Sequence, residues 1–198
     1  EMTVKKIYTD FTEKDILGLG YSIKEKVKLN SENQKKLLEI CENCNNSFVD
    51  GNIIGDPTEI CLKILTRKAN YVKTYKELDE KTFTSERKMM SSLHQVGKAK
   101  VIMAKGAFEV ILKKSNRILI NGKVEKLSKT HLKKIQEAAE NYSKEALRVL
   151  AFAYKEHKGK FEEEDFIFVG LVAMLDPPQK TVKESIQTAL KAGIQVKI

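Results

Sequence analysis

Lys105-Gly106-Ala107 combines residue types that bind phosphates. It follows the apolar run Val101 to Ala104, and a short helix-forming stretch, Phe108 to Lys113, comes directly after it. A turn from strand to helix exposes backbone amides, the helix dipole favours an anion there, and glycine permits close approach. Lysine adds a point charge for a phosphate or the edge of a base. Alone, this pattern is more typical of a solvated lysine at a strand end.

An aromatic ring begins a second segment that could do binding chemistry. Phe83 precedes a basic, hydroxyl-rich stretch, Thr84 to Arg87, and Lys88 comes five residues after the ring. An exposed aromatic side chain can stack on a base, and Lys88 can lie near a phosphate. The simpler interpretation is a strand whose Phe83 belongs to the core.

Glu59 and Arg148 could join such a site. Asp56 is a good N-cap and Pro57 suits the first helical position, so Gly55 to Glu59 is fully explained as a helix start. In a pocket, the Glu59 carboxylate could also accept a hydrogen bond from an adenine amino group. Arg148 opens an apolar strand, where a lone arginine is most often part of a surface ion pair.

The cysteines predict no metal site. Cys41 and Cys44 form one C-x-x-C pair, whereas structural zinc needs four ligands, usually from two such pairs. Cys61 and the three histidines are not at metal-ligand spacing, so helix packing explains the cysteines better. The familiar signatures of P-loop NTPases, serine hydrolases and zinc proteases are also absent.

The composition indicates a soluble, intracellular globular chain. Its 198 residues are 41% hydrophobic and 32% charged, which excludes wholesale disorder. The longest apolar run, Phe166 to Leu175, is about half of what a membrane-spanning helix needs. Three cysteines argue against a secreted disulfide scaffold. The net charge of +9 comes mostly from lysines interleaved with acids, which indicates a solvated surface rather than nucleic-acid binding.

Local patterns predict the elements that must position these residues. Helices are expected after the capping box at Ser31, after Asp56, and from about Ser128 to Glu145. Polar Asp10 to Lys28 is expected to be a loop. The predicted strands are Met2 to Tyr8, Val101 to Ala104, Ile118 to Ile120 turning through Asn121-Gly122 to Val124, Arg148 to Tyr154, and Phe166 to Leu175.

A break follows the last of these strands. Two prolines lack amides and fix φ, so Asp176-Pro177-Pro178 can continue neither a strand nor a helix. Beyond it, Thr181 to Ala192 is predicted to be a helix and Ile194 to Ile198 a strand. The pattern therefore predicts a mixed α+β body followed by part of an α/β unit.

The order of these signals is more specific than any one of them. Taken together, they resemble the P-type cation-transporting ATPases, and most of all the branch that includes the calcium pumps. The start of the chain is similar to the residues just after that family's phosphorylation motif, and its end to the approach to the Thr-Gly-Asp motif. The segments that carry the resemblance are Gly55 to Glu59, Phe83 to Lys88, Lys105 to Glu109, Ala146 to Ala151, and Met174 to Pro178.

The resemblance implies a fold and two domains. Residues 1–173 would form the nucleotide-binding domain, an α+β fold in which an antiparallel β-sheet is flanked by helices. Residues 174–198 would form the hinge and the start of the second half of the phosphorylation domain, a truncated α/β piece. The hinge residues would be Asp176, Pro177 and Pro178.

It also implies that ATP is the ligand. Phe83 would stack on adenine, Glu59 would lie near the adenine edge, and Arg148 would reach the phosphates. Lys88 and Lys105 would line the pocket.

Three neighbours of these residues complete the implied site. Gly106 would let the backbone approach the nucleotide. Ser85 stands where some family members carry a basic residue, so one phosphate contact would be missing. Phe108 replaces the family's usual proline, which removes some local rigidity.

The resemblance places the chemistry outside this chain. The chain lacks the phosphorylation motif, the Thr-Gly-Asp motif, magnesium-binding carboxylates and membrane helices, so it holds no catalytic residue. We expect a soluble, monomeric piece of the cytoplasmic part of a membrane pump, which binds ATP without turning it over. The Mg²⁺ ligands and the partners, namely the remaining phosphorylation, actuator and membrane domains, would lie elsewhere in the parent pump.

Two other hypotheses remain open from the residues. A self-sufficient phosphohydrolase would need a nucleophilic aspartate in a strand-end loop, and the contexts of Asp10 and Asp176 are unsuitable. A basic interaction module for nucleic acid or an acidic protein would bind with steep salt dependence and without Phe83.

Overall fold

A nine-stranded sheet forms the centre of the computed structural model, which describes residues 1–176 and 181–195. The strand order is β2-β1-β9-β8-β5-β4-β3; β6 joins β9 in parallel, and the other pairings are antiparallel. The strands are β1 Thr3–Thr9, β2 Thr12–Asp15, β3 Lys76–Lys81, β4 Met89–Val96, β5 Ala99–Ala107, β6 Ser115–Ile120, β7 Lys123–Lys126, β8 Arg148–Glu156 and β9 Phe166–Leu175.

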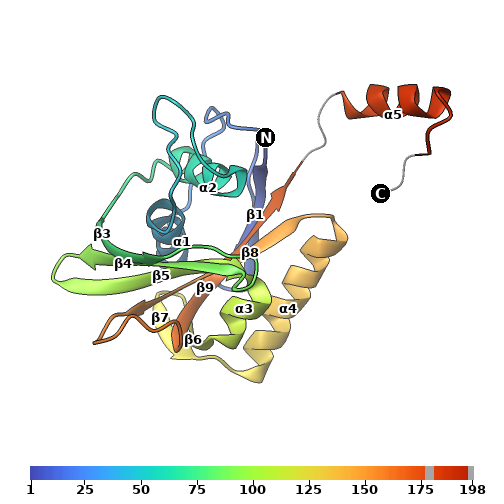
Figure 1. Ribbon diagram of the computed structural model, residues 1–198. Coiled ribbons are helices and arrows are strands. Elements are labelled where there is room, and N and C mark those ends of the chain that lie inside the picture. Colours follow the sequence, from blue (N-terminus) through green and yellow to red (C-terminus); the bar gives the residue numbers. More distant parts are fainter. Residues whose placement is uncertain (177–180, 196–198) are drawn as a thin grey trace.

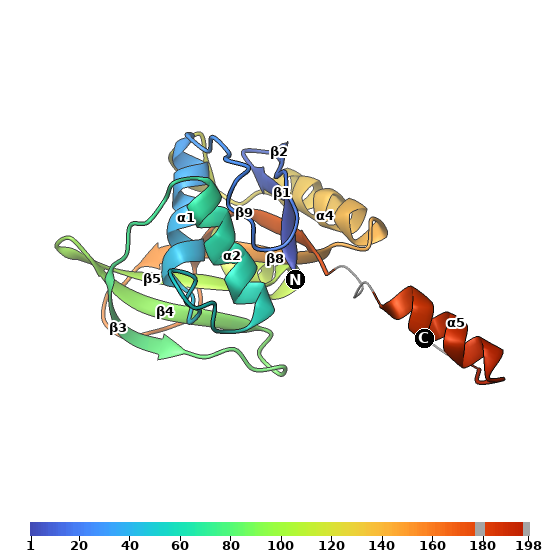
Figure 2. The same cartoon turned by 90° about the horizontal axis from the view of Figure 1, so that it is seen from above.

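Helices cover both faces of this sheet. The pair α1 and α2 lies on one face, and α3 and α4 lie on the other (Figures 1 and 2). Two apolar clusters separate accordingly: Leu37 and Leu62 belong to the first layer, whereas Ile135 and Phe166 belong to the second. The expected α+β fold with a flanked antiparallel sheet is therefore confirmed. The helices are α1 Glu32–Asn43, α2 Pro57–Lys68, α3 Phe108–Lys113, α4 Lys129–Lys144 and α5 Val182–Lys191.

The predicted helix starts are confirmed. Ser31 caps α1 with a reciprocal capping box to Gln34. The Oδ1 of Asp56 accepts a hydrogen bond from the Thr58 amide at 2.8 Å, and Pro57 stands at the first position of α2. Each start needs only residues that are close in sequence, which explains why local patterns predicted them.

The β6–β7 hairpin is also as expected. Its turn residues Asn121 and Gly122 have φ angles of 48° and 75°. Such positive values are what a tight hairpin turn requires, and asparagine and glycine adopt them most easily.

The segment Asp10 to Lys28, expected to be a loop, contains a strand. Asp10 and Phe11 have φ angles of 55° and 56°, and they turn the chain so that β2 pairs back onto β1. This edge strand is polar and mostly exposed, and so is β3 at the opposite edge. An edge strand exposed in this way needs no apolar alternation, so the pattern gave no signal.

The end of the described chain is a helix without a buried face. The expected helix is confirmed as α5, and none of its residues is buried. It stands apart from the sheet in Figure 1. Ile194 and Gln195 are not in a strand, while the rest of the predicted strand and the hinge residues Pro177 and Pro178 lie outside the described residues. The division at residue 173 stays a prediction.

Candidate functional site

A cavity of about 270 Å³ opens where the N-terminal end of α2 meets β4, β5 and β8. Half of its lining consists of residues that the sequence singled out: Glu59, Phe83, Lys105, Gly106 and Arg148. The other lining residues are Asn46, Asp56, Thr58, Met90 and Leu150. Segments far apart in the sequence therefore meet at one place.

Lys105 and Glu59 form an ion pair in the wall of this cavity. The Lys105 Nζ lies 2.6 Å from the Glu59 Oε1 and 2.6 Å from the backbone oxygen of Cys44. Lys105 is only 6% exposed, so the solvated lysine that its context favoured is wrong. A buried ammonium needs such acceptors because leaving it unpaired would be costly.

The backbone around Lys105 also differs from the expectation. Lys105-Gly106-Ala107 is part of β5 rather than a turn after it, and it pairs with β4 on one side and β8 on the other. The Ala107 amide donates to the Lys88 oxygen at 2.9 Å. The strand–turn–helix phosphate cradle is therefore not formed, and what remains at this position is the Lys105 side chain.

Glu59 is held from the loop between α1 and α2. The backbone amide of Asn46 donates a hydrogen bond to the Glu59 Oε2 at 3.2 Å. The Asn45 side-chain amide donates to the backbone oxygen of Glu59 at 2.9 Å. The Glu59 side chain is 16% exposed and lines the cavity, so its carboxylate is fixed in place yet still accessible to a ligand.

Phe83 lies at the rim of the cavity and is 53% exposed, so the alternative of a core phenylalanine is wrong. Its segment is anchored on both sides. The Lys81 Nζ donates to the Phe161 oxygen at 2.8 Å, and the Arg87 guanidinium binds the Glu163 carboxylate and the Thr82 oxygen. The ring is thus presented on a fixed backbone.

Ser85 and Lys88 are not among the lining residues. Both are exposed, in a turn that the Lys88 amide closes by donating to the Thr84 oxygen at 2.8 Å. Lys88 has a φ of 52°, and its own oxygen binds the Ala107 amide. Their roles toward ATP stay predictions.

Close packing against β4 requires a glycine at position 106. A Cβ at this position would come within 2.5 Å of the Lys88 oxygen and 2.6 Å of the Met89 Cβ. Real Cβ atoms do not approach so closely, so any larger residue would push the start of β4 away from β5. The close approach that the sequence attributed to a ligand is made first by the neighbouring strand.

Arg148, the first residue of β8, reaches toward α2. Its Nη1 donates to the Thr58 Oγ1 at 3.3 Å, and the surface ion pair expected of it is not formed with any carboxylate in the described part of the chain. Arg148, Asp56 and Thr58 also line an adjoining hollow of about 310 Å³, which reaches Asp176. The guanidinium therefore stands between the cavity and the end of β9.

Comparison with known proteins identifies the family. The family model described as "P-type ATPase, cytoplasmic domain N" matches residues 29–181. The chain belongs to this family. The resemblance found in the sequence is thereby confirmed, and the described cavity lies within the matched region of the N domain.

Relatives of the N domain carry the names of calcium pumps. Over 206 aligned residues, it is 39% identical to calcium-transporting ATPase 1 of Bacillus cereus, with 98% of this chain and 22% of the relative covered. Calcium-transporting ATPase 1 of Lactococcus lactis is 38% identical, with 87% and 21% covered. A calcium-transporting ATPase of Listeria monocytogenes is 36% identical, with 83% and 20% covered. The chain spans about a fifth of the length of these relatives.

Sequence reasoning missed part of the cavity lining of the N domain. Asp56 and Thr58 were noticed only as parts of the helix start, and Leu150 only as part of a predicted strand, while Met90 was given no role. Asn46 gave no signal, because it lies in a polar loop and only the fold brings it against Glu59. Alternation along a strand marks a buried face but does not tell a core from a cavity wall.

The N domain has no metal centre in its described residues. No group of three or more histidine, cysteine or acidic side chains there could hold a metal ion, and all three cysteines are free and buried. Burial raises the pKa of the Cys61 thiol to about 12, so it stays protonated and packs as a small apolar group. No described helix is long and apolar enough to cross a membrane.

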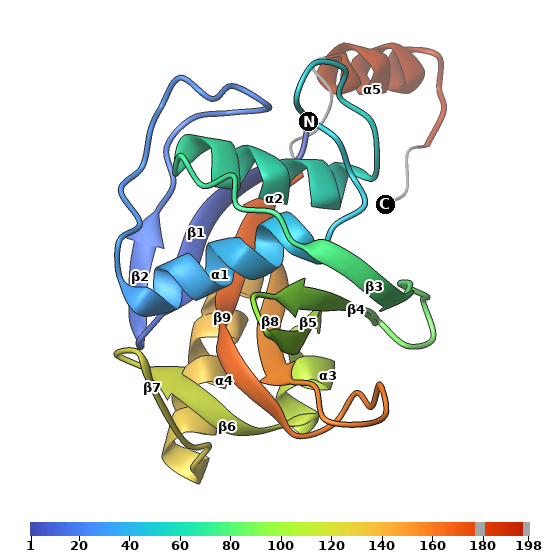
Figure 3. The ribbon, with the colours of Figure 1, turned by 90° about the vertical axis from the view of Figure 1, so that its left-hand side faces the viewer.

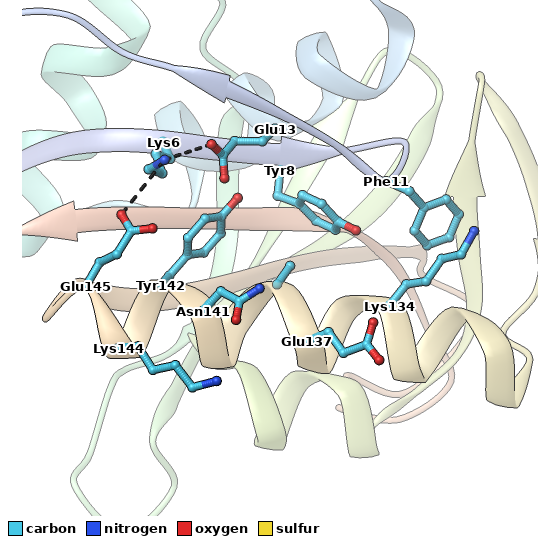
Figure 4. A pocket seen from close by; sticks show the side chains of 11 residues that line it. Lys6, Tyr8, Phe11, Glu13, Lys134, Glu137, Asn141, Tyr142, Lys144 and Glu145 are labelled. Carbon is cyan, nitrogen blue, oxygen red and sulfur yellow. Dashed lines mark hydrogen bonds and ion pairs between the residues drawn. The ribbon is translucent and has the colours of Figure 1, made fainter.

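A larger, more open hollow lies on the other face, between β1–β2 and α4 (Figure 4). Its charged groups neutralise one another: the Lys6 Nζ lies 2.7 Å from Glu13 and 3.8 Å from Glu145. Figure 4 shows lysines and glutamates alternating around the tyrosine rings. The first cavity, called the Lys105 cavity below, is the more enclosed of the two and brings together the residues that the sequence singled out.

Proposed function

We propose that this N domain binds ATP with the adenine ring in the Lys105 cavity and presents the γ-phosphate to an aspartate outside the chain. One observation carries the proposal: the buried Lys105–Glu59 pair and the exposed Phe83 ring line the same cavity. A base needs both an aromatic surface on which to stack and polar groups at its edge.

Each part of the cavity suits one part of the nucleotide. Phe83 would stack on adenine, with apolar Met90 and Leu150 beside it. Glu59 would accept from the adenine amino group and Lys105 would donate to a ring nitrogen. Arg148, at the border with the adjoining hollow, would bind a phosphate.

The expected affinity is weak. Stacking contributes about 1–3 kcal/mol and each charge-assisted hydrogen bond about 1.5–3 kcal/mol, while immobilising the nucleotide costs several kcal/mol. A net of about −4 to −5 kcal/mol corresponds to a Kd of roughly 0.2 to 1 mM. Weak binding suits a domain that must release ADP in every cycle.

The whole protein would be a P-type cation pump, and the names of its relatives favour calcium as the cation. The phosphorylated aspartate, the Mg²⁺ ligands and the actuator and membrane domains would lie in the rest of that pump. Residues 174–198 would be the hinge and the start of the phosphorylation domain. The chain alone would be a monomer that binds ATP without turnover.

The test is a calorimetric or NMR titration of this chain with ATP. Phe83→Ala should weaken binding by about 10-fold or more, which corresponds to the loss of one stacked base. Stability should not change, because the ring is 53% exposed. Phe48→Ala is the matched control, since Phe48 is 69% exposed but is not a lining residue of the cavity.

Other results would favour other functions. Absence of ATP binding at millimolar concentration would overturn the proposal. Binding that ignores Phe83 but collapses at raised salt would indicate a basic interaction module. Turnover of ATP or p-nitrophenyl phosphate by the isolated chain would indicate a self-sufficient phosphohydrolase.

A further inference from the structure

Asn46 joins the cavity wall to the edge strand β3. It lies just after α1 in the loop that leads to α2, and it lines the cavity. Its backbone amide donates to the Glu59 Oε2 at 3.2 Å, and its side-chain Nδ2 donates to the Glu80 Oε2 at 3.0 Å. Glu80 belongs to the edge strand β3 (Figure 3), and Phe83 comes two residues after the end of this strand.

The bond to Glu80 fixes the orientation of the Asn46 amide. An ionised carboxylate only accepts hydrogen bonds, so the NH₂ group rather than the oxygen of Asn46 must face Glu80. Glu80 is not a lining residue of the cavity, so the NH₂ group is directed out of it. The Oδ1 of Asn46 bonds to no donor in the described part of the chain, and it is the polar atom left for the cavity.

Asn46 and Glu59 are neighbours in the cavity lining, and each can offer an acceptor to a ligand: the Asn46 Oδ1 and the Glu59 carboxylate. Adenine carries an exocyclic amino group, a donor, where guanine carries a carbonyl oxygen, an acceptor. We propose that Asn46 is a specificity residue, held by Glu80, that makes the cavity accept adenine and reject guanine. This inference rests on the proposed function.

The two bases differ in what they leave unpaired. An amino group would satisfy the Asn46 oxygen, whereas a carbonyl at the same position would face that oxygen and leave it without a donor. A site built to hydrogen-bond one group discriminates against an analogue that lacks it, because its own polar atoms then stay unpaired. Only the ATP complex should gain from Asn46.

The experiment titrates the chain with ATP and with GTP and compares the two dissociation constants. Asn46→Ala removes the oxygen but keeps the backbone donor to Glu59. We expect ATP affinity to fall about 3- to 10-fold, the effect of one hydrogen bond, while GTP affinity stays the same or rises. Glu80→Ala leaves the amide free to rotate and should lower the ATP-to-GTP preference as well. Glu77→Ala, on the same strand and mostly exposed, is the matched control and should not change the preference.

The outcomes separate this inference from the function on which it depends. If the unchanged chain binds neither nucleotide, the proposed function fails. If it binds ATP and GTP equally, or if Asn46→Ala weakens both to the same extent, the role of Asn46 in base selection is wrong. A lowered preference in both variants, with unfolding temperatures unchanged, would support it.

Discussion

Two carboxylates in the α1–α2 layer, both paired with cations, have different roles. Glu42, on α1, is 1% exposed and binds Thr66 at 2.6 Å, Arg67 at 2.7 Å and Lys63 at 3.1 Å. Glu59, on α2, is 16% exposed and binds Lys105 at 2.6 Å and one backbone amide. Figure 3 shows the two helices side by side. Both residues are acids paired with cations, but only Glu59 lines a cavity.

The two carboxylates differ in how much of their hydrogen-bond acceptor capacity is taken up by partners within the protein. Three side chains from α2 bind Glu42, so it fastens one helix to the other and has no accessible face. Glu59 has fewer partners and keeps part of its acceptor capacity for a ligand. A buried ion pair is therefore a mark of a binding site here only where its carboxylate also opens to a cavity.

The largest expected effect is that of Glu42→Gln on stability. Removing the buried carboxylate leaves Lys63 without its counter-charge and Arg67 with Asp50 alone, so the free energy of unfolding should fall by about 3 kcal/mol. For a chain of this size, the unfolding temperature would fall by roughly 6–12 °C. Affinity for ATP should stay within about twofold, because Glu42 does not reach the cavity.

Urea denaturation of the wild type and the variant measures the difference in their free energies of unfolding. Glu32→Gln on the same helix is the control: Glu32 is 71% exposed and pairs with Lys35, so it should cost less than about 1 kcal/mol. Equal losses for the two variants would show that the Glu42 network is no stronger than a surface pair.

A smaller effect is expected from acid. Burial alone would raise the pKa of Glu42, but hydrogen bonds from Arg67 and Thr66 and the charge of Lys63 lower it below its ordinary value. Its contribution to stability is therefore complete above the unfolded pKa of about 4.3 and is lost as the pH falls through the lower, folded pKa. The difference in stability between wild type and Glu42→Gln should be constant from about pH 7 to 5 and shrink below about pH 4. A pH series of urea unfolding curves checks this, and a constant difference down to about pH 3 would contradict it.

The smallest effect on stability is expected from Glu59→Gln. Lys105 keeps the Cys44 oxygen as an acceptor and gains the new amide oxygen, and the Glu59 side chain already contacts solvent, so the loss should be about 1.5 kcal/mol. ATP affinity, in contrast, should fall by about 10-fold, because a carboxylate accepts more strongly than an amide. Titration and unfolding of this one variant test both numbers. A stability loss as large as that of Glu42→Gln with unchanged ATP binding would assign Glu59 to the structure instead.

The sequence predicted the helices of the N domain better than the strands at the edges of its sheet. Ser31, Asp56 and Ser128 start helices with hydrogen bonds to residues two or three positions away, so a local pattern was sufficient. The polar strands β2 and β3 escaped notice because they bury little and obtain their order by pairing with neighbouring strands. Pairing is a long-range interaction that a local pattern does not contain.

Part of the candidate site was also predicted from short sequence motifs. The order of five short motifs identified the family and with it Glu59, Phe83, Lys105, Gly106 and Arg148 as members of one cavity. Ser85 and Lys88 were expected beside them, but the turn between β3 and β4 places both outside the lining. The direction in which a turn presents its side chains depends on its anchors, here Arg87 on Glu163.

By itself, the sequence determined the family, the helix starts, most of the buried strands but not β4, and the residues that we propose to bind a nucleotide. Only the tertiary structure decided that Lys105 is buried against Glu59, that Phe83 is exposed, and that Asn46 is held by Glu80. The physical reason is that a side chain's charge, size and local propensity belong to its own residue. Its burial and its partners depend on segments that fold against it from elsewhere in the chain.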